Sequence, residues 1–268
     1  MGGGATVHAF RIPVLTLLLG GLGWFSFVNT LPAREVAAGA LDAFDSRPAR
    51  SILFVGNSRT FPFGMPYMVR EMADSAGAAE KYRIRMYAVP GRSLREHWED
   101  PEVQKLLAEE WDDVVLQERS AGHYSDASNE FHNYGALLVR AVADKGGRPV
   151  MFVGWNYSPE LFASAGPGSH SAYYQMIQND HFRLSRESGA QLANVGRVWQ
   201  SVLNANPPFR LETDGNHPTL HGSYLTALVI YSQLSGKSVA DVSYRPDDLP
   251  EADAKLLRDL ATTSLPAF

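Results

Sequence analysis

Residues 51–60 read SILFVGNSRT, a short apolar run followed by a glycine, an asparagine and a serine. The apolar residues Ile52 to Val55 predict a strand that is covered by helices on both faces, as strands of a parallel sheet usually are. Downstream, the same order of apolar run, turn and helix-like stretch recurs along the chain. This recurrence predicts an α/β fold with a parallel sheet.

The pattern predicts five strands with helices between them. The strands are expected at Ile52–Val55, Tyr82–Val89, Asp113–Leu116, Pro149–Gly154 and Gln191–Val195. The clearest helices are expected at about 63–77, 101–110, 131–145, 170–188, 218–235 and 250–262. Residues 51–268 are enough to bury one core without splitting into two, so they are interpreted as a single catalytic domain.

The N-terminal segment has a different character. Residues 12–28 are uncharged and mostly apolar, at the lower limit of the length that spans a bilayer, and arginines flank them on both sides. Residues 1–50 are therefore interpreted as a signal anchor or signal peptide plus a tether, with the anchor favoured. The protein is expected to be exported, periplasmic or extracellular, and held at the membrane by this segment. The alternative is a buried N-terminal helix of the globular domain.

Composition excludes several classes of function. The formal net charge is −5 and no run of Lys or Arg occurs, which argues against nucleic acid as a partner. The absence of cysteine excludes disulfides, cysteine nucleophiles and thiolate metal sites.

Ser58 stands in the loop that follows the first predicted strand. In parallel α/β sheets, ligands bind beyond the carboxyl ends of the strands, where such loops meet. A serine at this position can present its hydroxyl as a nucleophile while backbone amides at the turn stabilise an oxyanion. Alternatively, Ser58 only caps the turn or the following helix.

A partner for Ser58 is found in the segment 214–218, which reads DGNHP and precedes the helix expected at 218–235. Pro218 suits a first helical position, which would put His217 at the helix entrance. His217 would accept the proton of Ser58 through one ring nitrogen, and Asp214 would hold the other. The alternative is an ordinary turn with a surface histidine.

Together, these segments resemble the SGNH (GDSL-like) hydrolase superfamily. The resemblance covers about residues 51–235 and consists of a Gly-x-Ser after the first strand, a glycine after the second, a polar residue after the third, and Asp-x-x-His near the C-terminus. It implies a three-layer α/β/α, flavodoxin-like sandwich and ester hydrolysis through an acyl-serine intermediate. The roles that it implies are nucleophile for Ser58, base for His217, orienting acid for Asp214, and backbone oxyanion donors at Ser58 and Gly91.

The third block departs from the family pattern, because Gln117 and Glu118 stand where Gly-x-Asn-Asp is usual. Gln117 is the first candidate for the missing side-chain oxyanion donor, and Asn156 is the second. Trp155 and Asn156 are also candidates for binding substrate. Trp155, with Tyr157, Tyr173 and Tyr174, would line a pocket for a sugar or an acyl chain, or would belong to the core.

The sequence thus predicts a serine esterase without a cofactor or metal, acting on a small-molecule or glycan ester such as an O-acetylated glycan. The alternatives are an O-acyltransferase, which passes through the same acyl-enzyme, and a non-catalytic SGNH-like ligand-binding protein. A metal site at His217 and His221, four residues apart with Asp214 nearby, is a further rival.

Overall fold

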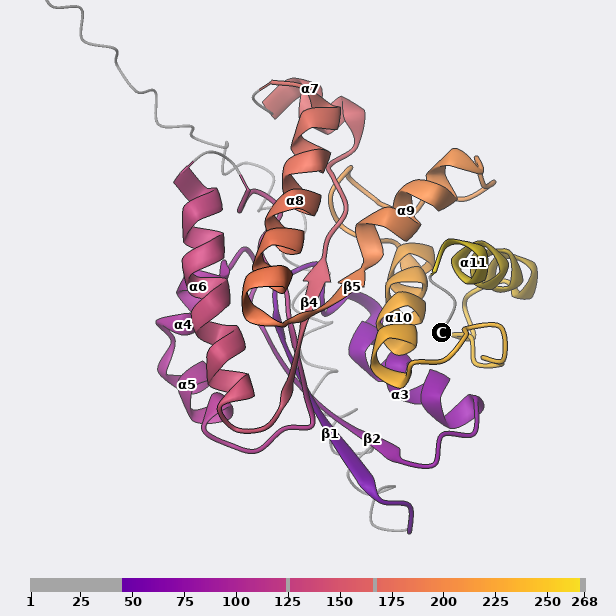
Figure 1. Ribbon diagram of the computed structural model, residues 1–268. Coiled ribbons are helices and arrows are strands. Elements are labelled where there is room, and N and C mark those ends of the chain that lie inside the picture. The colour runs from indigo at the N-terminus through magenta and orange to yellow at the C-terminus, as the bar shows by residue number, and fades with distance from the viewer. Residues whose placement is uncertain (1–44, 124–125, 166–167, 266–268) are drawn as a thin grey trace, which may run out of the picture. The chain divides into compact units, whose positions relative to one another are not determined.

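The computed structural model describes residues 45–123, 126–165 and 168–265 (Figure 1). Its centre is one sheet of five parallel strands in the order β2-β1-β3-β4-β5. This strand order is that of flavodoxin-like folds. The strands are β1 (Ala49–Gly56), β2 (Lys81–Ala88), β3 (Asp113–Leu116), β4 (Arg148–Val153) and β5 (Gln191–Asn194).

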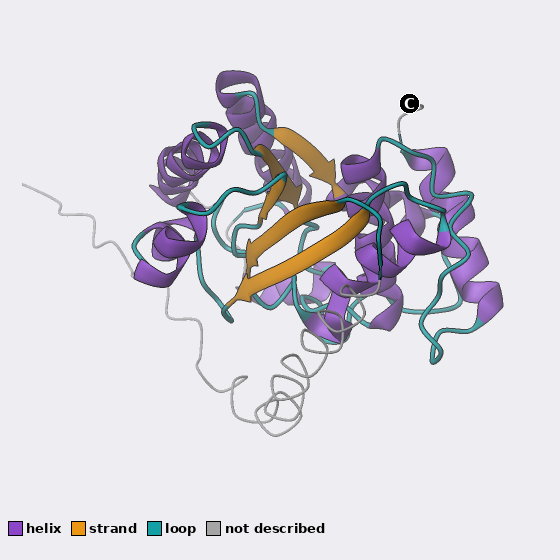
Figure 2. Cartoon of the chain, turned by 90° about the horizontal axis from the view of Figure 1, so that it is seen from below, coloured by secondary structure: helices purple, strands orange, loops and turns teal. Residues whose placement is uncertain are grey.

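Helices cover both faces of the sheet (Figure 2). In chain order, the described helices are η2 (Pro62–Gly64), α3 (Met65–Ser75), α4 (Leu94–Trp98), α5 (Pro101–Leu107), α6 (Asp126–Ala143), α7 (Pro159–Ala165), α8 (His170–Ser188), α9 (Val195–Asn204), α10 (Leu220–Ser235) and α11 (Glu251–Ser264). α3, α9, α10 and α11 pack together on one face, and α4, α5, α6 and α8 form the layer on the other face (Figure 1).

The two faces of β1 belong to two different hydrophobic cores. Ile52 and Phe54 pack in the larger core, with residues of α3, α9 and α10. Leu53 and Val55 point to the opposite face and pack in the core under α4 and α6. Successive side chains of a strand alternate between faces, so a strand between two helical layers is apolar at every position. The run from Ile52 to Val55, in which all four side chains are fully buried, meets this requirement.

The parallel register aligns the loops that carry the candidate site. Gly56 at the end of β1 pairs with Ala88 at the end of β2, and Val55 pairs with Leu116 at the end of β3. The loops after these three strands therefore emerge at the same edge of the sheet.

The predicted fold class, an α/β fold with five parallel strands, is confirmed, but three of the described helices lie outside the predicted ones. α4 is only five residues long, and a capping box between Ser93 and Glu96 starts it. α7 is a short helix after β4. α9 begins at Val195, which the prediction gave to the fifth strand, because the side chain of Asn194 caps the helix directly at the strand end.

The start of α10 also differs from the prediction. Pro218 is not the first helical residue, because it forms a β-bridge with Glu212. Thr219 is the N-cap, and its side chain accepts a hydrogen bond from the amide of Gly222. His217 therefore lies in a turn before the helix and not at its entrance.

The predicted signal anchor lies outside the described residues, and it stays a prediction, as does membrane attachment through it. Among the helices of the described part, none is both long and apolar enough to cross a membrane.

Gly222 in the first turn of α10 provides a test of the packing beside the 212–219 segment. Alanine normally stabilises a helix relative to glycine by about 1 kcal/mol. A Cβ at position 222 would, however, lie 2.2 Å from the carbonyl oxygen of Leu211 and 2.6 Å from the Trp199 ring. We expect Gly222→Ala to lower the free energy of unfolding by about 2 kcal/mol, measured by urea denaturation.

Gly135→Ala in α6 is the matched control. A Cβ there would meet the end of the Leu184 side chain at 2.7 Å, and a flexible side chain moves aside more easily than a backbone carbonyl. Gly135→Ala should therefore lower the free energy of unfolding by less than Gly222→Ala does. A Gly222→Ala protein as stable as the wild type would contradict the packing described for α10.

Candidate active site

The loop after β1 presents Ser58 in a tight turn. The amide of Thr60 donates to the carbonyl of Asn57 at 2.8 Å, and Gly56 has no room for a side chain, because a Cβ there would lie 2.2 Å from Thr60 Oγ1. The loop is also tied to its neighbour after β2, since Asn57 Nδ2 donates to the carbonyl of Arg92 at 3.0 Å. Ser58 is 9% exposed at the surface of this turn.

A second turn, before α10, carries Asp214 and His217. The amide of Thr213 donates to the carbonyl of His217 at 2.9 Å, which closes the turn. Asp214 Oδ1 accepts hydrogen bonds from the amides of Asn216 at 3.0 Å and His217 at 2.8 Å. Gly215 has a φ of +81°, a conformation that side-chain-bearing residues rarely adopt.

The two turns meet in one chain of hydrogen bonds. His217 Nδ1 lies 2.7 Å from Asp214 Oδ2, and His217 Nε2 lies 3.0 Å from Ser58 Oγ. Ser58 and His217 are 159 positions apart in the sequence, so the fold alone brings them together.

The charge of Asp214 determines how this chain is protonated. Burial by itself would raise the pKa of Asp214, but the hydrogen bonds from the His217 ring and from the His217 and Asn216 amides outweigh it and hold the pKa well below its usual range. An ionised Asp214 accepts a hydrogen bond from His217 Nδ1–H, which leaves Nε2 unprotonated as the acceptor for the Ser58 hydroxyl. This is the protonation state that a general base requires.

Arg59, next to Ser58, is a buried charged residue of the candidate site that the sequence did not single out. It is 3% exposed, and burial lowers its pKa to about 10, so it stays cationic at neutral pH. Its Nη1 donates to the carbonyl of Trp155 at 2.5 Å, and its Nε and Nη2 donate to Asn216 Oδ1 at 3.2 and 2.7 Å. The guanidinium also lies over the Trp155 ring, 4.4 Å from its centroid. Arg59 thus links the two turns and the loop after β4.

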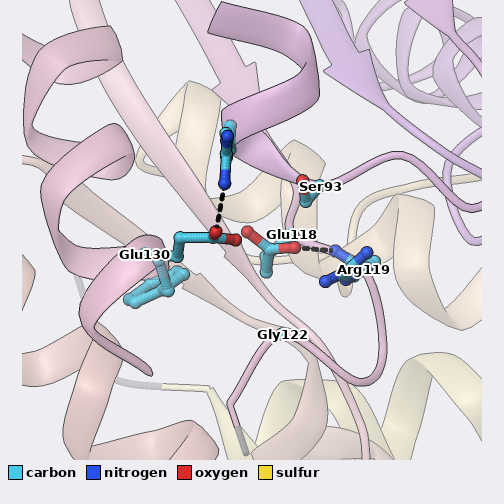
Figure 3. A pocket seen from close by; sticks show the side chains of 7 residues that line it. Ser93, Glu118, Arg119, Gly122 and Glu130 are labelled. Carbon is cyan, nitrogen blue, oxygen red and sulfur yellow. Dashed lines mark hydrogen bonds and ion pairs between the residues drawn. The ribbon is translucent and has the colours of Figure 1, made fainter. Parts of the chain in front are cut away.

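Glu118, also missed, holds the loops after β2 and β3 together. Its carboxylate accepts hydrogen bonds from the amides of Leu94 at 3.1 Å and Arg119 at 2.7 Å. It lies in a crevice at the centre of the side chains that line it, with Arg119 to one side and Glu130 to the other (Figure 3). Neither Ser58 nor His217 lines this crevice, so it is separate from the hydrogen-bonded chain.

Comparisons with known proteins place this arrangement in a family. A solved structure assigned as an SGNH hydrolase, from Slackia heliotrinireducens, is 31% identical and matches with a TM-score of 0.58 over 69% of this chain and 99% of that chain. The chain belongs to the SGNH hydrolase superfamily. No family model matches the sequence, and no curated protein matches it.

Two further solved structures share the fold at lower identity. A DUF4886 family protein from Bacteroides uniformis is 17% identical, with a TM-score of 0.65 over 81% of this chain and 94% of that chain. A protein assigned as a GDSL-like lipase, from Parabacteroides merdae, is 17% identical, with a TM-score of 0.57 over 72% of this chain and 98% of that chain.

In this SGNH hydrolase, Gln117 does not point an amide donor at Ser58. Its Oε1 accepts hydrogen bonds from the amide of Asn57 at 3.1 Å and from Thr60 Oγ1 at 2.9 Å. Its Nε2 donates to the carbonyl of Glu118. The oxygen of the Gln117 amide therefore braces the Ser58 turn, while its nitrogen is held by the Gln117 loop itself and forms no hydrogen bond with Ser58.

Asn156 and Trp155 are likewise used within the protein. Asn156 was the second candidate for the side-chain oxyanion donor. Its Nδ2 donates to the carbonyl of His170 at 2.7 Å. Trp155 is 2% exposed and stacks on Trp199 with 3.9 Å between ring centroids, so it belongs to the core and not to a substrate pocket. Tyr173 is also buried.

The two predicted backbone donors, the amides of Ser58 and Gly91, differ from these side-chain amides. Within the described residues, no hydrogen bond takes up the backbone amide of Ser58 or of Gly91. Gly91 has a φ of +74° and is exposed in the loop after β2, which Asn57 ties to the Ser58 turn.

His217 and His221, the rival metal pair, have separate partners. His221 Nε2 lies 2.8 Å from Asp253 Oδ2, and its ring stacks on Phe209. No group of three or more His, Asp or Glu side chains suited to a metal occurs in the described ranges.

The titration of Glu118 yields a prediction about stability. Burial raises its pKa to about 7, against the opposing effect of the two amide hydrogen bonds. A carboxyl group with a raised pKa stabilises the folded state below its unfolded pKa of about 4.3, and this contribution is lost as the pH rises through about 7. Relative to Glu118→Gln, the wild type should lose about 3 kcal/mol between about pH 5 and about pH 8.

Urea denaturation of both proteins across this pH range measures the effect. Other titrating groups, including the buried histidines, are common to both proteins and cancel in the difference. A difference that does not change with pH would show that Glu118 ionises normally in the folded state.

Proposed function

We propose that the chain is a serine esterase that hydrolyses carboxylic esters through an acyl-serine intermediate, with Ser58 as nucleophile, His217 as base and Asp214 as orienting acid. The observation that carries the proposal is the hydrogen-bonded chain from Asp214 Oδ2 through His217 to Ser58 Oγ. Membership of the SGNH hydrolases supports ester hydrolysis in general.

In the acylation half of the proposed reaction, Ser58 Oγ attacks the ester carbonyl carbon while His217 Nε2 takes the hydroxyl proton. The imidazolium that forms is stabilised by the ionised Asp214 at 2.7 Å. The tetrahedral intermediate then expels the alcohol, which receives the proton from His217 Nε2. The products of this half-reaction are the free alcohol and acyl-Ser58.

In the deacylation half, water replaces the alcohol. His217 Nε2 takes a proton from the water as its oxygen attacks the acyl carbon, and it then returns that proton to Ser58 Oγ as the carboxylic acid leaves. In both halves, negative charge develops on the former carbonyl oxygen. The untaken amides of Ser58 and Gly91 are the proposed backbone donors to it.

For the substrate, we propose a short-chain ester such as an O-acetyl group on a glycan. Support comes from the apolar segment 12–28, which favours export to a compartment where glycans are abundant. A periplasmic or extracellular location and attachment through residues 1–50 are part of the same proposal. Transfer of the acyl group to a sugar hydroxyl would use the same acyl-enzyme and differs only in the acceptor.

The proposal is tested with the full-length protein and a panel of aryl esters of increasing acyl length. Ser58→Ala and His217→Ala should each lower kcat by at least about 1,000-fold, since the nucleophile and its base act as a unit. Neither side chain belongs to a hydrophobic core, so thermal unfolding should show that the variants remain folded. An inactive wild type, or a fully active Ser58→Ala protein, would refute the esterase.

A chelator separates the proposed chemistry from the rival metal site. His217 contacts Ser58 and Asp214 through its two ring nitrogens, so the proposed reaction needs no metal there. Initial rates should be unchanged after incubation with EDTA and removal of the chelator by dialysis. Loss of activity that zinc restores would favour the metal site.

A further inference from the structure

We propose that Asn216 supplies the side-chain amide that hydrogen-bonds the ester carbonyl oxygen, and that Arg59 is the residue that positions this amide. The inference rests on the esterase function proposed above and deepens it. The asparagine that the family usually carries after the third strand is missing here. Asn216, one residue before His217, would replace it.

Other side-chain amides near Ser58 are already engaged. Three such amides stand on the loops around it, and the amide nitrogen of each donates to a main-chain carbonyl. The donors are Asn57, Gln117 and Asn156, and the respective acceptors are Arg92, Glu118 and His170. Among the described residues, none of the three amide nitrogens forms a hydrogen bond with Ser58 or His217.

In Asn216, by contrast, the amide oxygen is the atom that the surrounding side chains hold by hydrogen bonds. Asn216 Oδ1 accepts hydrogen bonds from Arg59 Nη2 at 2.7 Å and Nε at 3.2 Å, and from Ser120 Oγ at 2.9 Å. Three donors on one oxygen fix the orientation of the amide plane and leave Nδ2 on the far side from Arg59.

The Nδ2 of Asn216 consequently faces the reaction centre. It lies 3.4 Å from His217 Nε2, the same atom that lies 3.0 Å from Ser58 Oγ. A distance of 3.4 Å is long for a hydrogen bond, and His217 Nε2 has one lone pair, which the Ser58 hydroxyl uses. An ester oxygen bound beside Ser58 would give this N–H a better acceptor.

The charge of Arg59 strengthens the donor. Arg59 is 3% exposed, and its side-chain hydrogen bonds within the described residues all go to amide or peptide oxygens and not to a carboxylate. Its guanidinium also lies over the Trp155 and Tyr157 rings, and the negative charges of Glu212 and Asp214 act on it without a direct hydrogen bond. A cation hydrogen-bonded to the amide oxygen polarises the amide, so that its N–H becomes a stronger donor.

The consequence for the reaction is stabilisation of the tetrahedral intermediate. When Ser58 Oγ attacks, negative charge forms on the carbonyl oxygen, and the Arg59–Asn216 pair presents a fixed positive dipole to it. The buried positive charge therefore favours the charged intermediate more than the neutral ester.

The test is Asn216→Asp in the full-length protein. The aspartate keeps an oxygen for Arg59 and Ser120 and is nearly the same size, so the protein should be folded and at least as stable. It removes the N–H donor and neutralises Arg59. We expect kcat for an aryl ester to fall by about 100-fold or more, with little change in KM. Asn133→Asp, the same change on the exposed side of α6, should keep wild-type kinetics.

The pH profile distinguishes loss of the donor from an effect on His217. A carboxylate beside His217 Nε2 would also favour the protonated ring, but that inhibition disappears at high pH, whereas a missing donor is missing at every pH. The loss should therefore persist up to about pH 10. Asn216→Ala serves as a second variant that lacks the donor without adding charge, and its kcat should fall similarly.

The outcomes separate the two proposals. If the wild type is inactive or Ser58→Ala is active, the esterase function fails, and this inference fails with it. If the wild type is active and Ser58→Ala is inactive, but folded Asn216→Asp retains kcat within about threefold or regains it at high pH, Asn216 is not the donor and the esterase stands.

Discussion

The candidate site depends on the hydrogen bonds that the buried guanidinium of Arg59 makes to its surroundings. A cation that is removed from water must be surrounded by acceptors, and among the described residues no carboxylate hydrogen-bonds to this one. The acceptors are Asn216 Oδ1 and the carbonyl of Trp155, with the Trp155 ring beneath. Because one acceptor lies beside His217 and the donor lies beside Ser58, satisfying this charge also fixes the distance between nucleophile and base.

The sequence predicted most of the fold because three of its five described strands carry an uninterrupted apolar run. β1, β3 and β4 each carry an uninterrupted apolar run, which only a strand between two helical layers requires. The boundaries were less predictable. The pattern gave Val195 to β5, although Asn194 begins α9 there, because a valine suits both a buried strand and the inner face of a helix. Five-residue α4 is too short for periodicity to reveal.

The sequence located Ser58, Asp214 and His217 on loops that the structure brings into contact, but it could not assign the amides. An asparagine or glutamine after a strand can direct its nitrogen to a substrate or to a neighbouring carbonyl, and residue type does not distinguish these directions. Gln117 and Asn156 both turn to carbonyls, and Trp155 turns to the core. Arg59 was missed for a different reason, since arginine is almost never fully buried. Its adjacency to Ser58 was the available signal.

Moving the amide donor from the loop after β3 to the turn before α10 has a structural consequence. Acid, base and proposed donor then lie within four consecutive residues, 214–217, and Asp214 Oδ1 braces that turn from inside. The packing behind the turn is equally close, because Gly215 leaves no space between it and Ser158. With the donor placed there, the reaction does not require an amide from the loop after β3. That loop can instead use Gln117 to brace the Ser58 turn and Glu118 to hold the start of α4, which explains how the family's third block changes without loss of the surrounding geometry.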